Sequence, residues 1–206
     1  MTNKVDFKNV IEQTCAWNWN VQDEYKHLSM PELSKVMDAS RLPYAVCILN
    51  LAGDLNVGMI MRTACIMGAE RLIVFGRRRY DKRSTVGAQN YIPVARIAGL
   101  NEDLSFDVEA FDATMSHWNY QPVFIETGGN SIDATDWKSI SPKPCLVFGN
   151  EGQGIPDYIM RDYMRVSIDQ RGVLRSLNVA VAAGIACHEV SKCLSWALSF
   201  VLGNMM

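Results

Sequence analysis

The sequence predicts an α/β protein whose parallel sheet is covered by helices on both faces. Short apolar runs alternate with helical stretches, in the order YAVCILN, VGMIMRTACIMG, RLIVFG, PVFIET, CLVFG and MRVSI, and a long apolar helix follows from about Ser176 to Leu202. Strands that are buried on both faces have this uninterrupted apolar character, and helices are the usual connections between parallel strands. The composition, 49% hydrophobic and 20% charged in 206 residues, is ordinary for a globular protein.

The first segment, residues 1–40, predicts a helical N-terminal extension ahead of one α/β domain at residues 41–206. This segment is richer in polar residues and tryptophan, and two helices are expected, separated near residues 29–31. Ser29 is suited to cap the second helix, Pro31 fits its first turn, and Glu32 stands three residues after the cap, as in a capping box.

Composition excludes several classes of protein. The chain has no run of about 18 apolar residues, so no membrane span is expected. The N-terminus lacks the apolar core of a signal peptide, which favours the cytoplasm. The six cysteines form no C-x-x-C pair and predict buried thiols in a reducing compartment, without a metal site. The net charge of −2 argues against nonspecific nucleic-acid binding by the whole surface, but it leaves room for a local basic patch.

Polar loops follow four of the predicted strands. Parallel α/β sheets bind ligands outside the carboxyl ends of their strands. The loops at residues 50–56, 127–129, 149–154 and 169–178 all have this position. If these strands are neighbours, their loops meet at one pocket.

The helix that follows the first loop carries a single charged residue, Arg62, six residues after a predicted cap at Asn56. In isolation Arg62 reads as a surface arginine. The surrounding residues are apolar nearly all round, however, which predicts burial on most sides. A buried arginine needs an anionic partner, and Glu151 is the natural candidate.

The loop FGNEGQG, residues 148–154, has the glycines of a nucleotide-binding turn but the wrong pattern for one. Its spacing is G-x-x-G-x-G rather than G-x-G-x-x-G, and it lacks the Gly-Lys-Ser/Thr of a Walker loop. Glu151 at its centre would repel a phosphate. The glycines are explained equally well by a tight strand-to-helix turn.

The third cluster, SLNVAVAAGI, opens the C-terminal helix. Ser176 and Asn178 are suited either to cap this helix or to belong to a site. Five small residues between positions 180 and 186 predict close packing against backbone or against another subunit. His188 is a core or interface histidine in preference to a catalytic base.

Together, the segments NVGMIMRTACIMGA, VFGNEGQGI and SLNVAVAAGI resemble the three ordered motifs of the SpoU/TrmH branch of SPOUT RNA methyltransferases. FIETGG matches a segment that commonly precedes the second motif, and the resemblance covers roughly residues 42–195. It implies a SPOUT-type parallel sheet with a C-terminal trefoil knot, and a homodimer. It also implies that the chain transfers a methyl group from S-adenosylmethionine to a ribose 2′-oxygen of structured RNA, with tRNA favoured over rRNA.

The resemblance also assigns roles to residues. The catalytic set would be Arg62, supported by Asn56, Glu151, Ser176 and Asn178. The cofactor would contact Gly149, Ile168 and Leu177, largely through backbone groups, with Thr127 a further candidate. Because the pKa of arginine exceeds about 12, we expect Arg62 to position the ribose or a phosphate while that phosphate assists deprotonation. A glutamate in the glycine loop is then harmless, because the adenosyl-methionine moiety carries no phosphate.

One departure affects the predicted cofactor site. Many family members have Ile-Pro-Met before the third motif, whereas this chain has Ile168-Asp169-Gln170. Loss of the proline is expected to loosen a cofactor-binding turn, and Asp169 is placed either to contact the ligand or to pair with Arg171. The segments QRGVLRSLNV and VGAQNYIPV are similar to the methylase domain of eukaryotic tRNA guanosine ribose methyltransferases.

A basic segment, RRRYDKR at residues 77–83, is the predicted RNA contact. Its basic residues are Arg77, Arg78, Arg79, Lys82 and Arg83. A solvated loop is the alternative interpretation, but beside a methylation pocket these side chains would bind phosphates. A silent RNA-binding or assembly module on the same fold is the alternative function.

Overall fold

The computed structural model describes residues 20–50, 56–76, 82–101, 103, 105–149, 155 and 157–203. The chain divides into two compact units, Met1–Ala39 and Ser40–Met206. Each unit is described by itself.

The first unit contains η1 (Asp23–Tyr25) and most of α2 (Met30–Ser40). The start of α2 has the predicted capping box. The backbone nitrogen and the hydroxyl of Ser29 both donate to the carboxylate of Glu32, at 2.9 and 2.7 Å. Pro31 lies in the first turn and Leu33 is the buried residue of the helix. The other predicted helix falls largely at residues 1–19, outside the described residues.

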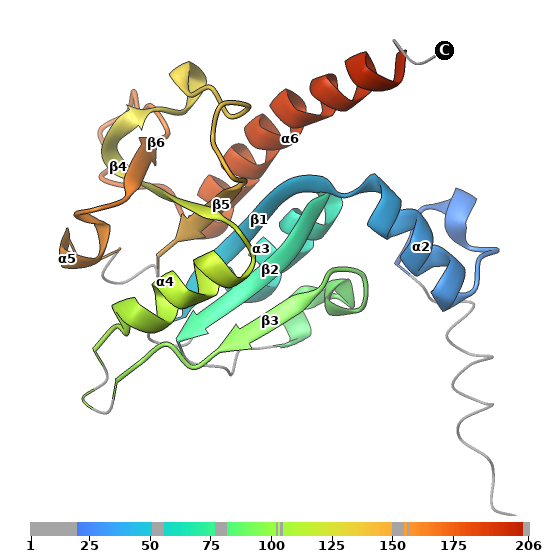
Figure 1. Cartoon of the computed structure of the whole chain (residues 1–206), viewed down its shortest axis with the longest axis horizontal. Helices are drawn as coiled ribbons and strands as arrows, with labels where there is room; N and C mark the ends of the chain where they lie inside the picture. Colours follow the sequence, from blue (N-terminus) through green and yellow to red (C-terminus); the bar gives the residue numbers. More distant parts are fainter. Residues whose placement is uncertain are drawn as a thin grey trace, which may run out of the picture. The chain divides into compact units, whose positions relative to one another are not determined.

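The second unit is built on a sheet of six strands, all parallel, which confirms the predicted fold class (Figure 1). The strands are β1 (Leu42–Asn50), β2 (Ala69–Gly76), β3 (Val94–Ile97), β4 (Gln121–Ser131), β5 (Pro144–Phe148) and β6 (Met164–Ser167). Their order is β3-β2-β1-β5-β4-β6, which places β1 and β5 at the centre. The predicted knot stays a prediction.

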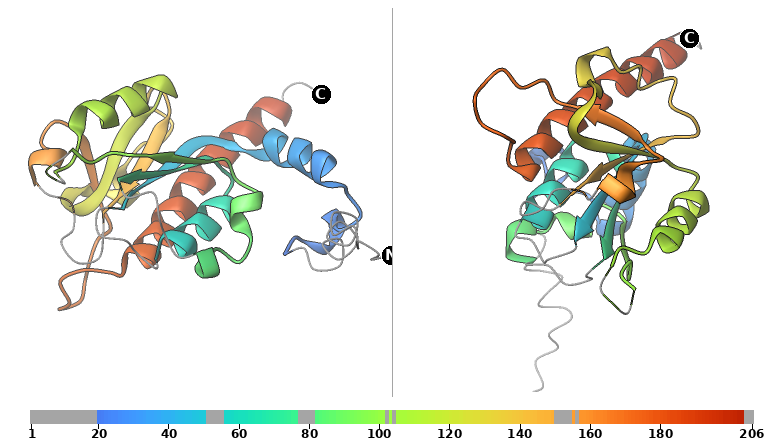
Figure 2. Two further views of the ribbon diagram at one scale, coloured as in Figure 1. Left: turned by 90° about the horizontal axis from the view of Figure 1, so that it is seen from below. Right: turned by 90° about the vertical axis from the view of Figure 1, so that its left-hand side faces the viewer.

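Helices cover both faces of this sheet (Figure 2). One face packs against α3 (Asn56–Ile66) and α6 (Val179–Gly203), and the other against α4 (Val108–His117) and α5 (Asp157–Met160). The side chains of β1 alternate between the two layers: Val46 and Ile48 enter the first, and Ala45 and Cys47 the second. Because the central strands are buried on both sides, they read as continuous apolar runs.

The helix α3 is less buried than its composition predicts. Ile60, Met61 and Ala64 are fully buried against the sheet and α6, but Met59 is 52% exposed and Ile66 is 70% exposed. Arg62 lies on the same exposed side. The prediction that Arg62 is buried on most sides is therefore wrong, because an apolar composition does not require burial all round when no described element covers one side of the helix.

The cysteines that the structure describes are free thiols, and three of them, Cys47, Cys145 and Cys187, are buried as expected. Burial raises the pKa of the Cys187 thiol to about 12. Burial, followed by the contact with Cys47, also raises the pKa of Cys145 well above its ordinary value. Among the described residues, no helix is both long and apolar enough to span a membrane.

Candidate functional site

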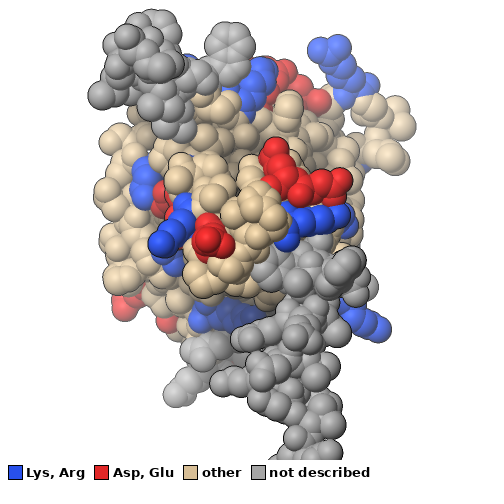
Figure 3. Space-filling model, turned by 90° about the vertical axis from the view of Figure 1, so that its right-hand side faces the viewer, with Lys and Arg blue, Asp and Glu red and all other residues tan. Residues whose placement is uncertain are grey.

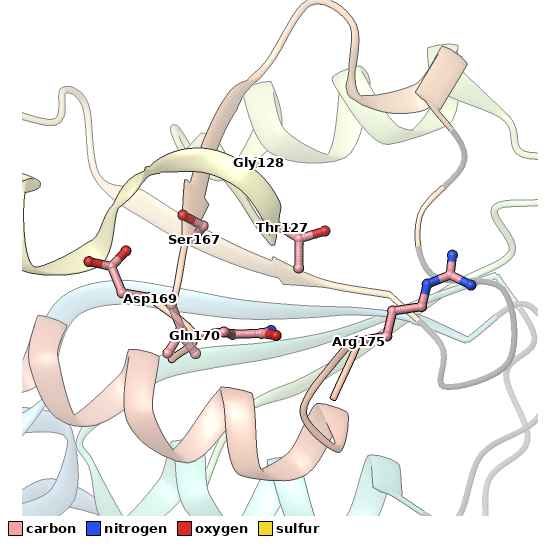
Figure 4. Close-up of a pocket in the computed structure, with 7 residues that line it drawn as sticks. Thr127, Gly128, Ser167, Asp169, Gln170 and Arg175 are labelled. Atoms are coloured by element: carbon pink, nitrogen blue, oxygen red, sulfur yellow. The ribbon is translucent and has the colours of Figure 1, made fainter. Parts of the chain in front are cut away.

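A cavity of about 350 Å³ lies at the carboxyl end of β6 and beside the second half of β4, near where the topology predicts a ligand site (Figure 4). It is lined by Thr127, Gly128, Ser167, Ile168, Asp169, Gln170 and Arg175. Two of the four predicted cofactor contacts, Thr127 and Ile168, line this cavity. Gly149, at the end of β5, and Leu177, which is 40% exposed, do not.

An irregularity in the pairing of β4 with β6 shapes one wall of the cavity. The register shifts between Ile125 and Asn130, so the residues between them leave the regular ladder. Gly128 takes a left-handed conformation, with φ of 79°, which favours glycine. A Cβ on Gly129 would lie 2.5 Å from the backbone of Arg165, so only glycine fits at this close approach. The Ser167 hydroxyl ties the wall to β6 by donating to the Gly129 carbonyl at 3.0 Å.

The departure from Ile-Pro-Met creates specific hydrogen bonds. The Ser131 hydroxyl donates to Asp169 Oδ2 at 3.0 Å, which ties the turn after β6 to the end of β4. The side-chain amide of Gln170 is oriented so that its nitrogen faces acceptors and its oxygen faces donors. In this orientation Gln170 Nε2 donates to the carbonyls of Leu174 and Arg175, each at 3.2 Å. These contacts brace the turn that a proline would otherwise stiffen. Asp169 and Arg171 form no ion pair in the described part of the chain.

Two of the predicted catalytic residues meet beside this turn. The Asn178 amide donates to Asn56 Oδ1 at 3.4 Å, which joins the start of α6 to the start of α3. Asn178 also caps α6, because its Oδ1 accepts from the amides of Ala180 and Val181 at 2.9 and 3.3 Å. Asn178 can therefore cap the helix and belong to the site at the same time. Ser176 lies two residues before the cap, so the C-terminal helix begins at Val179 and not at Ser176.

Two of the remaining predicted catalytic residues, Arg62 and Ser176, form no hydrogen bond to this pair among the residues that the structure describes. Arg62, on α3, is exposed and forms no ion pair with any residue that the structure describes. Glu151 falls within residues 150–154, outside the described residues, so the predicted pairing of Arg62 with Glu151 stays a prediction. Ser176 is exposed.

The end of the basic segment lies against the start of α3. Arg77, Arg78 and Arg79 are outside the described residues, as is the side chain of Lys82, but η2 (Lys82–Thr85) is described and Arg83 is exposed. A Cβ on Gly58 would lie 2.7 Å from the backbone atoms of Ser84 and Thr85. Gly58 thus permits η2 to touch the first turn of the helix that carries Arg62.

Sequence reasoning missed Ser131 and Ser167, which hold the cavity together, and did not place Arg175 in the cavity. Serines carry no distinctive signal in a sequence. The paired glycines 128 and 129 are the visible sign in the sequence of the tight wall within β4.

The relatives and structural neighbours that comparisons find carry names of RNA methyltransferases or RNA-modifying enzymes. An uncharacterized tRNA/rRNA methyltransferase of Mycolicibacterium gilvum is 30% identical over 154 residues, which are 71% of this chain and 46% of the relative. Another of Synechocystis is 28% identical over 167 residues, 78% of this chain and 41% of the relative. The chain thus spans less than half the length of these two relatives.

Solved structures share the fold. An AdoMet-bound rRNA methyltransferase from Sinorhizobium meliloti superposes with a TM-score of 0.60 at 28% identity, over 79% of this chain and 60% of that one. A TrmH/SpoU tRNA modifying enzyme of A. aeolicus superposes with a TM-score of 0.64 over 82% and 83% of the two chains; at 20% identity it supports the fold alone. The model of the SpoU rRNA Methylase family matches residues 43–188, which include β1 from its second residue on, the cavity and the Asn56–Asn178 contact. The chain belongs to the SpoU rRNA Methylase family.

Proposed function

We propose that this protein is an S-adenosylmethionine-dependent RNA 2′-O-ribose methyltransferase acting on structured RNA, with tRNA the favoured substrate. The observation that carries the proposal is the position of the cavity. It lies beside the second half of β4 and at the carboxyl end of β6, and the turn after β6 leads from it directly to Asn178 and its contact with Asn56. A structural neighbour at 28% identity has S-adenosylmethionine bound.

The residues of the cavity fit this cofactor. A volume of about 350 Å³ falls within the usual range for small-ligand sites, roughly 300–1,000 Å³. Thr127 and Ile168 line the cavity and would contact the ligand, and Gly149 and Leu177 are the further proposed contacts. When bound, the cofactor supplies a methyl group on a sulfonium, which is already a good leaving group.

The task of the protein side chains is then to place the ribose hydroxyl in line with that methyl group. Positioning of this kind is worth about 7–11 kcal/mol in well-oriented reactions. Arg62 is exposed and can therefore reach an RNA, where its guanidinium would bind the ribose or a neighbouring phosphate. It would not be the base, because its pKa exceeds about 12. The hydrogen bond between Asn56 and Asn178 holds the start of α3 against the start of α6. Ser176 and Glu151 are the further catalytic candidates.

The decisive test is transfer of labelled methyl from S-adenosylmethionine to unmodified tRNA, followed by alkaline hydrolysis. A 2′-O-methyl ribose cannot assist cleavage of its own linkage, so label should survive in alkali-resistant dinucleotides. Label recovered only in mononucleotides would show base methylation and refute the ribose assignment.

The same assay separates the alternative functions. Unmodified rRNA in a parallel reaction tests the substrate, since label in rRNA alone would reject tRNA. A chain that binds S-adenosylhomocysteine but labels neither RNA would favour the silent RNA-binding module. Replacing Arg62 by Lys should reduce methyl transfer at least tenfold, since lysine cannot reproduce a bidentate guanidinium contact.

The proposed RNA contact is the basic segment at residues 77–83. Its described end, η2, touches α3 through Gly58 and therefore lies next to the helix that bears Arg62. Elsewhere the described surface is mixed: on the face drawn in Figure 3, acidic and basic side chains are interspersed over a largely neutral area. RNA affinity should fall as salt rises, because phosphate contacts release counterions. An affinity that is independent of salt would contradict this contact.

We also propose a homodimer formed through the outer side of α3 and α6. These helices pack side by side on one face of the sheet. Among the side chains that the structure describes on these helices, Met59, Ile66, Val181 and Ile185 are 40–70% exposed. A second copy of the chain is the occupant that the proposed enzyme requires. The change Ile185→Glu should convert the dimer to monomer in sedimentation velocity, while Tyr158→Glu on α5, against the other face, should not. A wild-type monomer would refute the proposal.

The N-terminal segment, residues 1–40, is proposed to be an extension of the catalytic domain at residues 41–206.

The described cysteines are free thiols, which supports a reducing compartment such as the cytoplasm.

A further inference from the structure

The cavity carries one acidic and one basic side chain, at opposite ends. Asp169 and Arg175 are the charged residues among those that line it. Figure 4 shows them at the two ends of a row, with the neutral Gln170 between them. A ligand that fills this row therefore meets a carboxylate at one end and a guanidinium at the other.

One hydrogen bond holds the Asp169 side chain, and another holds the backbone of Arg175. The Ser131 hydroxyl donates to one oxygen of Asp169, at 3.0 Å, and no described residue donates to the other. Gln170 holds the carbonyl of Arg175 at 3.2 Å, which fixes the backbone from which the guanidinium extends. Arg175 forms no ion pair with any described residue, so its charge is available to a ligand.

We infer that this charge arrangement orients the cofactor, with Asp169 accepting a hydrogen bond from the nucleoside part and Arg175 pairing with the methionyl carboxylate. The inference rests on the proposed function and deepens it. Asp169 stands where many members of the family have proline, so this contact is a property of this chain and not of the common motif.

Chemistry favours this orientation over the reverse one. Methyl transfer converts the cationic sulfonium into a neutral thioether, so the positive charge on sulfur is lost along the reaction. A carboxylate placed against the sulfonium would stabilise the starting complex more than the transition state and would slow the reaction. At the nucleoside end, the same carboxylate can accept from an amino or hydroxyl donor without that cost. The methionyl carboxylate needs a cation, and Arg175 supplies one at the end of the cavity that leads to Asn178.

The test is the affinity of three ligands for the full chain, measured by titration calorimetry without RNA. The ligands are S-adenosylmethionine, S-adenosylhomocysteine and 5′-methylthioadenosine, which retains the nucleoside and lacks the amino-acid part. The change Asp169→Asn should weaken all three by the same factor, roughly tenfold for a hydrogen bond to a charged group. The change Arg175→Gln should weaken the first two about fivefold and leave 5′-methylthioadenosine unchanged.

Matched controls are available in the same region. Arg171→Gln removes an arginine from the same turn, and Asp133→Asn removes an exposed acid near β4. Neither residue lines the cavity, so neither change should alter any affinity.

The opposite pattern would overturn the inference. If Asp169→Asn weakens S-adenosylmethionine but not 5′-methylthioadenosine, the acid faces the cationic part and the orientation is reversed. If neither variant changes any affinity, the charges do not orient the cofactor. A wild-type chain that binds none of the three ligands contradicts the proposed function itself, which keeps the two failures distinct.

Discussion

The contact between α3 and η2 gives the most specific prediction, through the change Gly58→Ala. The added Cβ would lie 2.0 Å from Ser84 Oγ and 2.7 Å from two backbone atoms, the carbonyl carbon of Ser84 and the nitrogen of Thr85. The hydroxyl can rotate away, but the backbone cannot. Because ordinary carbon contacts lie at about 3.5–4.0 Å, η2 must retreat by roughly 1 Å.

Two opposing terms set the effect on stability. Overpacking of this kind costs about 1–3 kcal/mol, whereas alanine is favoured over glycine within a helix by about 1 kcal/mol. We therefore expect a net loss of roughly 0–2 kcal/mol in the free energy of unfolding. The functional loss should be larger, because a displacement of 1 Å can cost about a hundredfold in rate, and η2 carries the exposed Arg83.

The assay combines urea unfolding, calorimetry with S-adenosylhomocysteine and methyl transfer to RNA. Gly58→Ala should leave cofactor affinity at the wild-type value while it lowers transfer at least tenfold. Ser84→Ala removes only the hydroxyl, so in a double-mutant cycle it should relieve part of the defect and leave the part that is due to the backbone. Wild-type transfer by Gly58→Ala would show that η2 is not seated on α3 in the way described.

Three further predictions concern stability. The pKa of the Cys187 thiol is raised from 9.0 to about 12, so the thiol contributes stability that is complete below pH 9 and is lost as the pH rises toward 12. Urea unfolding at pH 8 and 10.5 should show a loss about 2 kcal/mol larger in the wild type than in Cys187→Ala, at 1.36 kcal/mol per pH unit. Ser29→Ala removes the capping box of α2 and should speed amide hydrogen exchange in its first turn severalfold, without affecting the sheet. Gly129→Ala would bring a Cβ within 2.5 Å of the backbone of β6 and should cost about 1–3 kcal/mol together with cofactor binding, whereas Gly172→Ala, which meets no atom within 4 Å, should be silent in both assays.

The strands that the sequence predicts are those with the strongest physical signal. Five of the six, all except β3, are predicted. The inner strands β1, β2, β4 and β5 contain continuous apolar runs, because burial on both faces removes the alternation that would otherwise confuse strand with loop. The edge strand β6 is predicted from the run MRVSI, although it is short and only partly buried. The strand β3 was missed. It is an edge strand of four residues, Val94–Ile97, and is only partly buried, so a short stretch of mixed character is all that its sequence shows. The helix α4 was missed too, although Asp107 caps it by accepting from the Ala110 amide at 2.9 Å.

The site was predictable where a motif fixes the backbone and unpredictable where side chains meet across the fold. The contact of Asn56 with Asn178 joins positions 122 residues apart. The sequence predicts that both belong to the catalytic set, but it does not predict the hydrogen bond between them. The bond from Ser131 to Asp169 joins positions 38 apart and had no precursor in the sequence reasoning. The expected loosening of the turn at Asp169 stays a prediction, and the hydrogen bonds of Asp169 and Gln170 act against it.

The wrong prediction about Arg62 points to the assembly. Met59, Arg62 and Ile66 are spaced by three and four residues, which places them on one side of α3, and this side is exposed in the single chain. Apolar residues on an exposed helix face are costly unless another surface covers them. A dimer formed through α3 and α6 would remove Met59 and Ile66 from water and would bring Arg62 to the margin of the interface. In that arrangement the apolar character of the helix reflects the dimer rather than the single chain, and Arg62 becomes partly desolvated at the point where an RNA phosphate would meet it.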